Sequence, residues 1–247
     1  MSGLCLVGLL DSGVDPALTY ANFPRRSFAV TGDGALSHCD DGAPDLLGHG
    51  TALARIILAD NPAAPMAVAR IFSDSFSCTP AAAAAGLDWL VDQGVRAVNM
   101  SFGLREDRAI LRDSCRRAAE SGVVLLGAAP ARGPGVFPSS YDAVIRISGD
   151  ARLRPGEVSI LGGLQADFGA CPMPMEADMP DGKPIGGASF AVAHAMAVAL
   201  PFLTGNPGAG AAELCDYLTS IARFQGPERR TVETSPAAPE GDTPCSP

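Results

Sequence analysis

Three short motifs carry side chains that could work together in acyl chemistry. Asp11 ends an apolar run and is followed by Ser-Gly, His49 stands between two glycines in a Gly-His-Gly-Thr motif, and Ser189 lies between Gly-Ala and Phe-Ala. A carboxylate, an imidazole and a hydroxyl are the parts of a relay in which a base takes the proton of a nucleophile while an acidic group orients the base.

Each motif also has a simpler structural explanation. An Asp after a strand is commonly a turn or cap residue, and a Ser before an apolar helix is commonly an N-cap. A lone His beside glycines indicates little by itself. The three motifs together, in the order Asp, His, Ser, are harder to explain as three caps, and this favours a shared site.

The elements that must position these residues alternate between strand-like and helical patterns. This rhythm predicts an α/β fold of three layers, with a mostly parallel central sheet flanked by helices. Parallel strands end at one common edge, where Asp11 and Ser101 follow their strands. The predicted strands are Leu4–Leu10, Met66–Phe72, Ala97–Ser101, Val123–Ala128 and Ala143–Ser148, and the predicted helices are His49–Ala59, Ala81–Gln93, Arg108–Glu120, Ser189–Leu200 and Ala211–Ala222.

The length suits one domain with a short tail. A chain of 247 residues is long enough to bury about 70–75% of its unfolded surface without disulfide or metal support. We predict one domain over residues 1–225. Residues 226–247 are rich in Pro, Glu, Thr and Ser, which is typical of a disordered tail.

Composition argues against several classes of protein. The formal net charge of -9 disfavours a nucleic-acid groove, which needs clustered Lys and Arg. A nucleotide-binding protein is disfavoured because no G-x-G-x-x-G follows a strand and no Walker loop occurs. The seven cysteines are odd in number and contain no C-x-x-C, so we expect no disulfide framework, no metal and no cofactor.

The same features favour a cytoplasmic protein. Reduced thiols are typical of that compartment, and the first ten residues lack the basic region and cleavage site of a signal peptide. The apolar stretch over residues 186–203 contains His194 and Pro201, which favours a buried helix over a membrane span. We therefore expect no membrane association.

The motifs resemble the subtilase family of serine peptidases, and the order Asp, His, Ser is that of subtilisin itself. Residues 86–94 and 98–103 resemble the helix and the substrate-binding strand of subtilases, and residues 118–126 resemble the next helix and strand. Residues 137–145 and 187–194 resemble the segment beyond the binding pocket and the serine helix. The resemblance covers roughly residues 4–222 and implies a subtilisin-like fold.

The resemblance also implies a role for each residue of the relay. Ser189 would attack the scissile carbonyl, His49 would accept its proton and return it to the leaving amine, and Asp11 would orient and stabilise the imidazole. The backbone N–H of Ser189, at the start of a helix, would be one oxyanion donor. By the same resemblance, His194 would be a packing residue of the serine helix and not a base.

A second group of residues would bind the substrate. By resemblance, Ser101, Phe102 and Gly103 form an edge segment that pairs with an extended polypeptide, and Gly103 leaves room for the substrate backbone. Val136 falls near the main specificity pocket, and its bulk predicts a modest pocket.

The largest departure from the family pattern concerns the second oxyanion donor. Subtilases place an asparagine after the strand that ends near Ala129, whereas this chain continues with Pro130. Proline offers no N–H and no side-chain amide, and loss of this donor in subtilisin lowers turnover by about 10²–10³-fold. We hypothesise that Arg132 supplies a substitute donor.

Other departures concern the surroundings of the site. Asp11 is so close to Met1 that we expect no N-terminal chaperone-like prosegment. Asp60-Asn-Pro62 replaces a longer loop that walls the family's cleft, so we expect the cleft to be open there. Ala188 and Ala193 stand where the family usually has Thr and Pro.

These inferences leave more than one function open. The leading hypothesis is an intracellular peptidase that cuts one partner polypeptide or leader peptide, similar to small bacterial subtilases that mature the peptide-derived cofactor subunit of quinohemoprotein amine dehydrogenase. The alternatives are a peptide-binding pseudo-peptidase, since a donor is lost at Pro130, and a peptide macrocyclase, which differs in resolving the acyl-enzyme with an amine instead of water.

Overall fold

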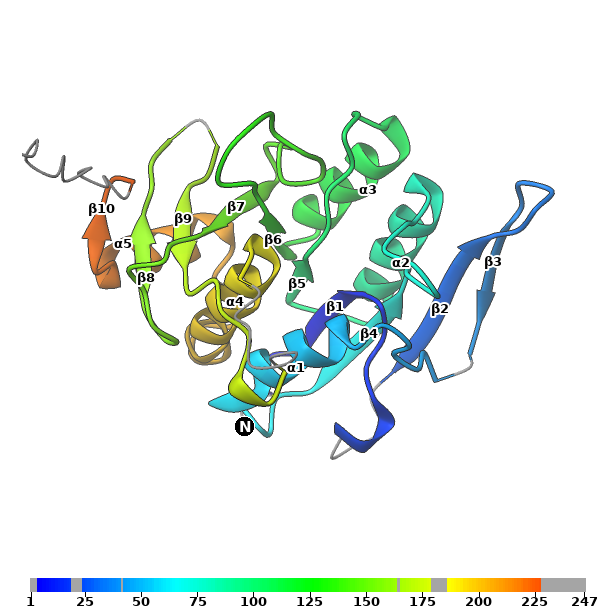
Figure 1. Ribbon diagram of the computed structural model, residues 1–247, viewed down its shortest axis with the longest axis horizontal. Helices are drawn as coiled ribbons and strands as arrows, with labels where there is room; N and C mark the ends of the chain where they lie inside the picture. The colour runs from blue at the N-terminus through cyan, green and yellow to red at the C-terminus, as the bar shows by residue number, and fades with distance from the viewer. Residues whose placement is uncertain (1–3, 19–23, 41, 164, 179–185, 228–247) are drawn as a thin grey trace, which may run out of the picture.

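The computed structural model describes residues 4–18, 24–40, 42–163, 165–178 and 186–227. Over these ranges the strands form one sheet in the order β10-β8-β9-β7-β6-β5-β1-β4-β2-β3 (Figure 1). The strands are β1 Val7–Asp11, β2 Arg25–Val30, β3 Leu36–Cys39, β4 Met66–Arg70, β5 Ala97–Met100, β6 Val124–Ala128, β7 Val144–Gly149, β8 Val158–Ile160, β9 Phe168–Ala170 and β10 Phe224–Gln225. The helices are α1 His49–Ala59, α2 Pro80–Asp92, α3 Ala109–Glu120, α4 Ala188–Gly205 and α5 Ala211–Ile221, with short 3₁₀ turns at Pro16–Leu18 and Glu176–Asp178.

Parallel pairing at the centre of the sheet brings the strand ends together. β1 lies between β4 and β5, parallel to both, with Asp11 opposite Arg70 at the carboxyl end. Only the pairs β2–β3 and β8–β9 are antiparallel within the described residues. Because β1, β5, β6 and β7 run in the same direction, the residues that follow them share one edge.

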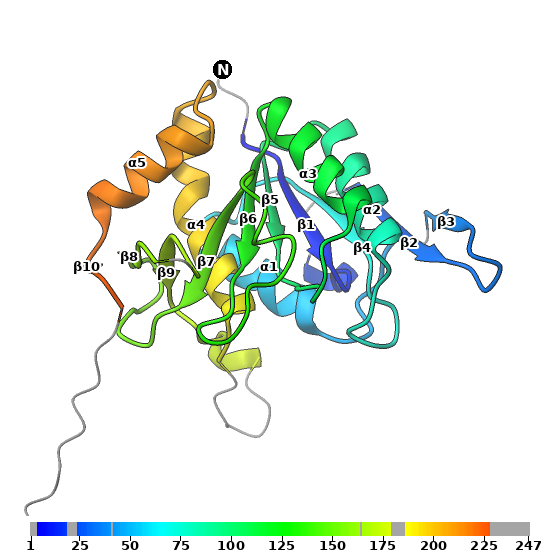
Figure 2. The ribbon, with the colours of Figure 1, turned by 90° about the horizontal axis from the view of Figure 1, so that it is seen from above.

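Helices cover both faces of the sheet, and each face has its own apolar core. α2 and α3 pack together on one face, whereas α1, α4 and α5 lie on the other (Figures 1 and 2). The alternation of a strand divides β1 between them: Leu9 belongs to the core of the α1 and α4 face, and its neighbour Leu10 to the other. The three-layer α/β prediction is confirmed.

Most of the predicted elements are present, with shifted ends. α1 has the predicted bounds, and the other predicted helices and strands differ at their ends by a few residues. The largest difference is α4, which continues through Pro201 to Gly205. Proline removes a single backbone hydrogen bond, and the apolar face of this helix, including Leu200 and Leu203, stays buried on the sheet.

α4 is long and apolar enough to cross a membrane by length and composition, and among the described residues it is the one helix that meets this test. Its central residues, among them Met196 and Ala199, are instead buried inside the fold. Its apolarity is therefore that of a core helix lying between the sheet, α1 and α5.

The first two residues of the predicted tail, Gly226 and Pro227, belong to the described part of the chain. Phe224 and Gln225 form β10 beside β8. Gly226 donates from its N–H to the carbonyl of Ile160 at 2.8 Å, and its own carbonyl accepts from Arg152 at 2.8 Å. Residues 228–247, the rest of the predicted tail, lie outside the described residues.

The expectation of an open cleft beside Asp60-Asn-Pro62 is wrong. α1 begins with His49 at the carboxyl edge and ends at Ala59, and the link then enters β4 at Met66, which lies opposite Val7 at the start of β1. The link is therefore at the amino edge of the sheet, where its length cannot shape a cleft at the carboxyl edge.

The packing of α1 predicts a large cost for a cavity under it. Leu53 is fully buried in the core of the α1 and α4 face, whereas the Leu46 residue is 66% exposed. Leu53→Ala should lower the free energy of unfolding by about 2–5 kcal/mol, and Leu46→Ala by less than about 0.5 kcal/mol. Urea denaturation followed by circular dichroism measures both, and equal losses would contradict this packing.

Candidate active site

A buried carboxylate and an imidazole meet at the carboxyl edge of the sheet. Asp11, the last residue of β1, is fully buried, and its Oδ1 lies 2.7 Å from Nδ1 of His49, the first residue of α1. Oδ1 also accepts from the N–H of Ser12 at 2.8 Å, while Oδ2 has no hydrogen-bond partner within the described residues. A carboxylate without access to water depends on this partner, so the pair is held tightly.

Glycines allow the start of α1 to come this close to β1. A Cβ on Gly50 would lie 2.2 Å from the carbonyl oxygen of Gly13 and 3.3 Å from Oδ1 of Asp11. Gly13 has a positive φ of 102°, and a Cβ there would lie 2.4 Å from the carbonyl oxygen of Ala43. The glycine after His49 is therefore required by the close backbone contact that sets the distance between imidazole and carboxylate.

Asp45 holds the first turn of α1 from outside the helix. Its Oδ1 accepts from the N–H of Gly48 at 2.9 Å and from the hydroxyl of Ser12 at 2.9 Å. Its Oδ2 accepts from the N–H and the hydroxyl of Thr51 at 2.8 and 2.6 Å. The hydroxyl of Ser12 in turn accepts from the N–H of Gly50 at 2.9 Å. This network satisfies donors that the helix leaves free and joins α1 to the turn after β1.

Two carboxylates raise the pKa of His49. Burial of the imidazole acts to lower its pKa, but the charge and hydrogen bond of Asp11 and the charge of Asp45 outweigh burial, so the pKa lies above the ordinary 6.5. Protonated His49 therefore adds stability that is fully present below the ordinary pKa and is lost as the pH rises through the raised pKa.

Ser189 lies at the start of α4, close to the residue that follows β5. Its hydroxyl donates to the carbonyl oxygen of Ser101 at 3.2 Å, and the hydroxyl of Ser101 donates to the carbonyl of Ser189 at 3.1 Å. Asn99 holds Ser101 with its side-chain amide at 2.8 Å. No hydrogen bond joins Ser189 to His49, although both side chains line one cleft of about 400 Å³.

Aromatic rings surround the imidazole in that cleft. The ring centre of His49 lies 5.5 Å from that of Phe76, edge to face, and 6.0 Å from that of Phe190. Phe72 and Phe102 continue the same wall. Phe76 is 65% exposed, so this wall offers apolar surface to an entering ligand.

The predicted substrate segment lines the cleft, but its glycine has another neighbour. Ser101, Phe102 and Gly103 all face the cleft that contains His49. A Cβ on Gly103 would lie 2.7 Å from Cγ2 of Val136. Val136 therefore occupies the space into which a side chain at residue 103 would point, and the room that we expect Gly103 to leave for a substrate backbone stays a prediction.

The same contact bears on the expected pocket. The loop that carries Val136 is fixed by two hydrogen bonds between the backbones of Leu104 and Phe137, at 2.7 and 2.9 Å. Val136 is therefore held against Gly103, and the modest pocket that we expect beside it stays a prediction.

The oxyanion region has one free donor and one unusual neighbour. Ser189 lies in the first turn of α4, where a backbone N–H has no intrahelical partner. No side chain caps this end of the helix either. Across from it, the N–H of Ala129 is used by the carbonyl of Ile147 at 2.8 Å, and Pro130 has none. Arg132 is exposed and makes no hydrogen bond or ion pair in the described part of the chain, so its role as a donor stays a prediction.

Some functional residues carry no signal that pattern reading could use. Asp45 bonds to Ser12, which is far from it in the sequence, and Asn99 acts by holding Ser101. Phe76 looks like an ordinary loop residue in sequence. His194, predicted to be a packing residue of α4, is 6% exposed, and its Nε2 lies 2.9 Å from the carbonyl oxygen of Met173. In the described ranges, no group of three or more His, Cys, Asp or Glu side chains is arranged to hold a metal ion.

The raised pKa of His49 predicts the effect of removing a distant carboxylate. Asp45→Asn should lower the pKa of His49, because one of the two charges that favour the protonated imidazole is lost. NMR titration of the imidazole C–H signals measures the change. Asp92→Asn, at the exposed end of α2, is the matched control and should leave this pKa unchanged, and an equal response to both variants would contradict the assignment.

Comparisons with known proteins agree with this geometry. Residues 4–150 match the subtilase family. Subtilisin DY from Bacillus licheniformis is 26% identical over 238 residues, which cover 89% of this chain and 84% of that protein. The minor extracellular protease Epr of Bacillus subtilis (strain 168) is 27% identical over 154 residues, and these span 58% of this chain but only 23% of Epr.

A solved structure shows the same fold. A protease from Pseudoalteromonas arctica has a TM-score of 0.67 and 17% identity, with coverage of 92% of this chain and 88% of that chain. The family match extends over more than half of the sequence and includes the Asp11 and His49 motifs. The chain belongs to the subtilase family and is a serine endopeptidase of the subtilisin type.

Proposed function

We propose that this peptidase acts inside the cell on one partner polypeptide, which it cleaves through an acyl-enzyme on Ser189. The observation that carries the proposal is the contact of buried Asp11 with His49, which lines the same cleft as Ser189 and the Ser101 segment. A relay at the edge of a groove suits an extended chain, because the substrate can add its backbone to the segment that follows β5.

The chemistry needs one rotation before it begins. In the free enzyme the Ser189 hydroxyl donates to the carbonyl of Ser101, and catalytic hydrogen bonds often form only once substrate is bound. After the hydroxyl turns to His49, the imidazole accepts its proton while the oxygen attacks the scissile carbonyl. Asp11 stabilises the imidazolium, which then returns the proton to the leaving amine.

The charge that develops on the substrate oxygen meets an incomplete set of donors. The N–H of Ser189 and the uncapped N-terminus of α4 favour negative charge there. Pro130 stands near the place of the family's amide donor and cannot replace it. A lost donor lowers turnover by about 10²–10³-fold, which a processing enzyme with a single bound substrate tolerates better than an enzyme of general digestion.

The state of the thiols supports an intracellular location. The cysteines Cys5, Cys39, Cys78, Cys115, Cys171 and Cys215 are all free, and Cys39 is exposed. Free thiols persist in reducing compartments, whereas secreted proteins tend to pair theirs. A leader peptide, including that of a peptide-derived cofactor subunit, is the kind of partner that we propose.

Two neighbouring functions share this site. A peptide-binding module without cleavage is favoured by one observation, since the Ser189 hydroxyl is bonded to Ser101 and not to His49. A macrocyclase would use the same acyl-enzyme and would resolve it with a substrate amine. All three functions require the peptide to lie in the cleft, and they differ in the product.

The decisive experiment looks for a product that depends on Ser189. The enzyme and small proteins encoded beside it are co-expressed, with Ser189→Ala as the comparison, and intact-protein mass spectrometry follows each neighbour. We expect one neighbour to be shortened only with the wild-type enzyme, because loss of the nucleophile lowers turnover by about 10⁶-fold in subtilisin.

The other outcomes distinguish the alternatives. A neighbour that co-purifies with both forms and is never cut favours the binding module, and a product that has lost only the mass of a departing segment and carries no free α-amine favours cyclisation. Labelling of Ser189 by a fluorophosphonate, absent in His49→Ala, shows that the relay works. Failure to label the folded wild-type protein would sink the peptidase mechanism.

The contact between Val136 and Gly103 predicts a preference for small side chains before the cut. Val136→Gly should raise kcat/KM by about tenfold for a peptide with a large apolar residue there, relative to one with alanine, since each added methylene in a pocket changes binding by about 1–3 kcal/mol. Paired fluorogenic peptides measure the ratio. Val91→Ala on α2, away from the cleft, serves as the control and should leave the ratio unchanged. An unchanged ratio in Val136→Gly would show that this residue does not limit the pocket.

A further inference from the structure

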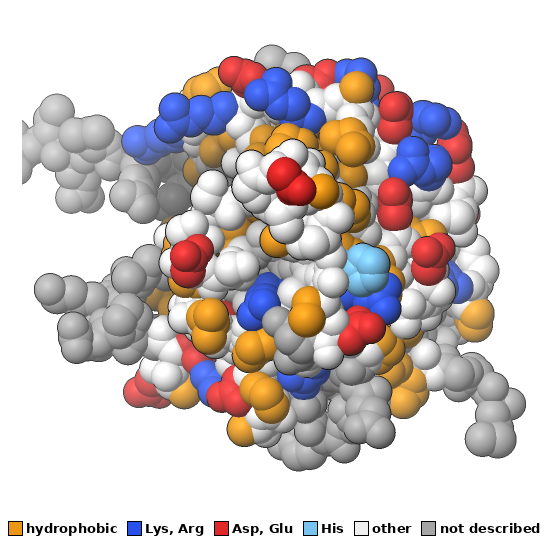
Figure 3. Space-filling view, turned by 90° about the vertical axis from the view of Figure 1, so that its right-hand side faces the viewer, with side chains coloured by type: hydrophobic (Ala, Val, Ile, Leu, Met, Phe, Trp, Pro, Cys, Tyr) orange, Lys and Arg blue, Asp and Glu red, His pale blue; other side chains and the backbone are white. Residues whose placement is uncertain are grey.

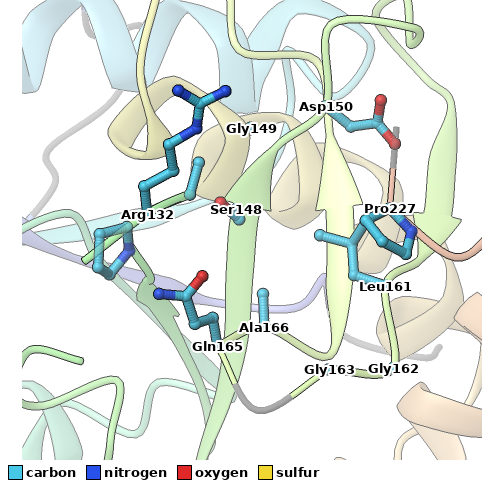
Figure 4. Close-up of a pocket in the computed structure, with 12 residues that line it drawn as sticks. Arg132, Ser148, Gly149, Asp150, Leu161, Gly162, Gly163, Gln165, Ala166 and Pro227 are labelled. Atoms are coloured by element: carbon cyan, nitrogen blue, oxygen red, sulfur yellow. The ribbon is translucent and has the colours of Figure 1, made fainter. Parts of the chain in front are cut away.

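A second cavity, separate from the cleft of His49, opens at the carboxyl edge of the sheet. It has a volume of about 580 Å³ and lies among the loop after β6, the end of β7 and the connection between β8 and β9. In Figure 4, Arg132 and Gln165 project from one side, and Leu161 and Pro227 lie opposite. It shares no lining residue with the cleft that contains Ser189.

A buried hydroxyl without a partner lines this cavity. Ser148 is 2% exposed, and its Oγ makes no hydrogen bond with any residue that the structure describes. A buried hydroxyl without a hydrogen bond costs free energy, which a ligand that bonds to it recovers. Ser148 therefore brings an unused hydrogen-bonding group to the wall of this cavity.

The charge on the cavity wall is positive and unopposed. Arg132 contributes a guanidinium that has no ion-pair partner in the described ranges. The one acidic side chain on the wall is Asp150, and it is already neutralised by a two-point contact with Arg152 at 2.9 and 2.6 Å and by the Ser159 hydroxyl at 2.7 Å. A guanidinium and a hydroxyl donor together fit a carboxylate.

The cavity is connected to the neighbourhood of the nucleophile. Arg132, Ser148 and Gly149 also line a second hollow of about 600 Å³, which extends to Gly187 and Ala188, the residues just before Ser189. In the sheet, β5 and its cleft are followed by β6 and then β7. Arg132 and Ser148 therefore lie on the β6 and β7 side of the Ser101 segment.

We propose that Arg132 and Ser148 form a subsite for a substrate carboxylate on the amine side of the scissile bond. If the acyl half of the substrate lies along Ser101, the departing half leaves Ser189 toward β6 and β7, where this cavity receives it. The subsite names a feature of the polypeptide in the proposed function, an acidic residue or a chain-terminal carboxylate after the cut, and it rests on that function only in assuming a peptide substrate.

Binding to an inactive enzyme tests the subsite without a natural partner. Ser189→Ala is titrated with fluorescein-labelled random peptide pools that carry amidated ends and differ only in Glu against Gln, and with a third Gln pool that has a free C-terminal carboxylate. Fluorescence anisotropy should show binding about five- to tenfold tighter for a carboxylate-bearing pool, as expected for one charge-assisted hydrogen-bonding contact. The Glu pool reports a side chain, and the third pool reports a chain end.

Substitutions in the same background assign the effect to the cavity. Arg132→Gln and Ser148→Ala should each reduce the preference for the carboxylate, and Arg132→Glu should reverse it. Arg116→Gln, which removes the same charge from an exposed ion pair on α3, should keep it. Equal binding of all pools, or a preference that survives Arg132→Glu, overturns the subsite.

The active enzyme separates this role from that of an oxyanion donor. Digestion of a proteome-derived peptide library followed by mass spectrometry should show acidic residues enriched at one position after the cut. Arg132→Gln should remove this enrichment, because kcat/KM falls more for peptides with an acidic residue there than for peptides without one. A uniform loss of turnover with no change in sequence preference supports the donor role and overturns the subsite. Absence of all cleavage together with a carboxylate preference in binding would count against the peptidase function and leave the subsite standing.

Discussion

The site depends on one short contact between a buried carboxylate and an imidazole. Asp11 has no access to water, and one of its oxygens is used by His49 and by the N–H of Ser12. The fold must therefore deliver the imidazole to the end of β1 within hydrogen-bond distance, and it does so with the first residue of a helix. The glycine that follows His49, the turn at Gly13 and the carboxylate of Asp45 are all needed to bring this helix so near.

The helix and the relay are consequently stabilised by the same groups. Asp45 accepts hydrogen bonds from the first turn of α1 and also raises the pKa of His49 through its charge. Ser12 links Asp45 to Gly50 beside the relay. A group that stabilises the helix start thus also sets the proton affinity of the base. On the face shown in Figure 3, acidic and basic side chains lie side by side. The charges that raise the pKa of His49 are those of Asp11 and Asp45, beside it.

The sequence was sufficient for the layers and for the pairing of Asp11 with His49, but not for the surroundings of that pair. Continuous apolar runs predicted the central strands, because these strands are buried on both faces of the sheet. The helical period of the apolar residues predicted the helices that cover both faces. The hairpin of β2 and β3 was missed, since it is an edge element whose pattern, Arg-Arg-Ser-Phe-Ala-Val, is half exposed. The position of the link at Asp60 was wrong because a loop's length does not reveal at which edge of the sheet it lies. The contact of Asp45 with Ser12 and the Arg132 cavity depend on contacts between distant segments, which periodicity does not report.

The contact of Val136 with Gly103 constrains how a lineage of such enzymes can change its substrates. The Cβ position of residue 103 is already taken by a valine methyl group at 2.7 Å, so a side chain can be gained at 103 only after bulk has been lost at 136. A smaller side chain at residue 136 takes a single mutation, whereas a side chain at residue 103 takes two mutations, with the one at 136 first. Changes in substrate preference should therefore begin with acceptance of larger substrate side chains, and a return to the original pair of residues passes through the same variant at residue 136.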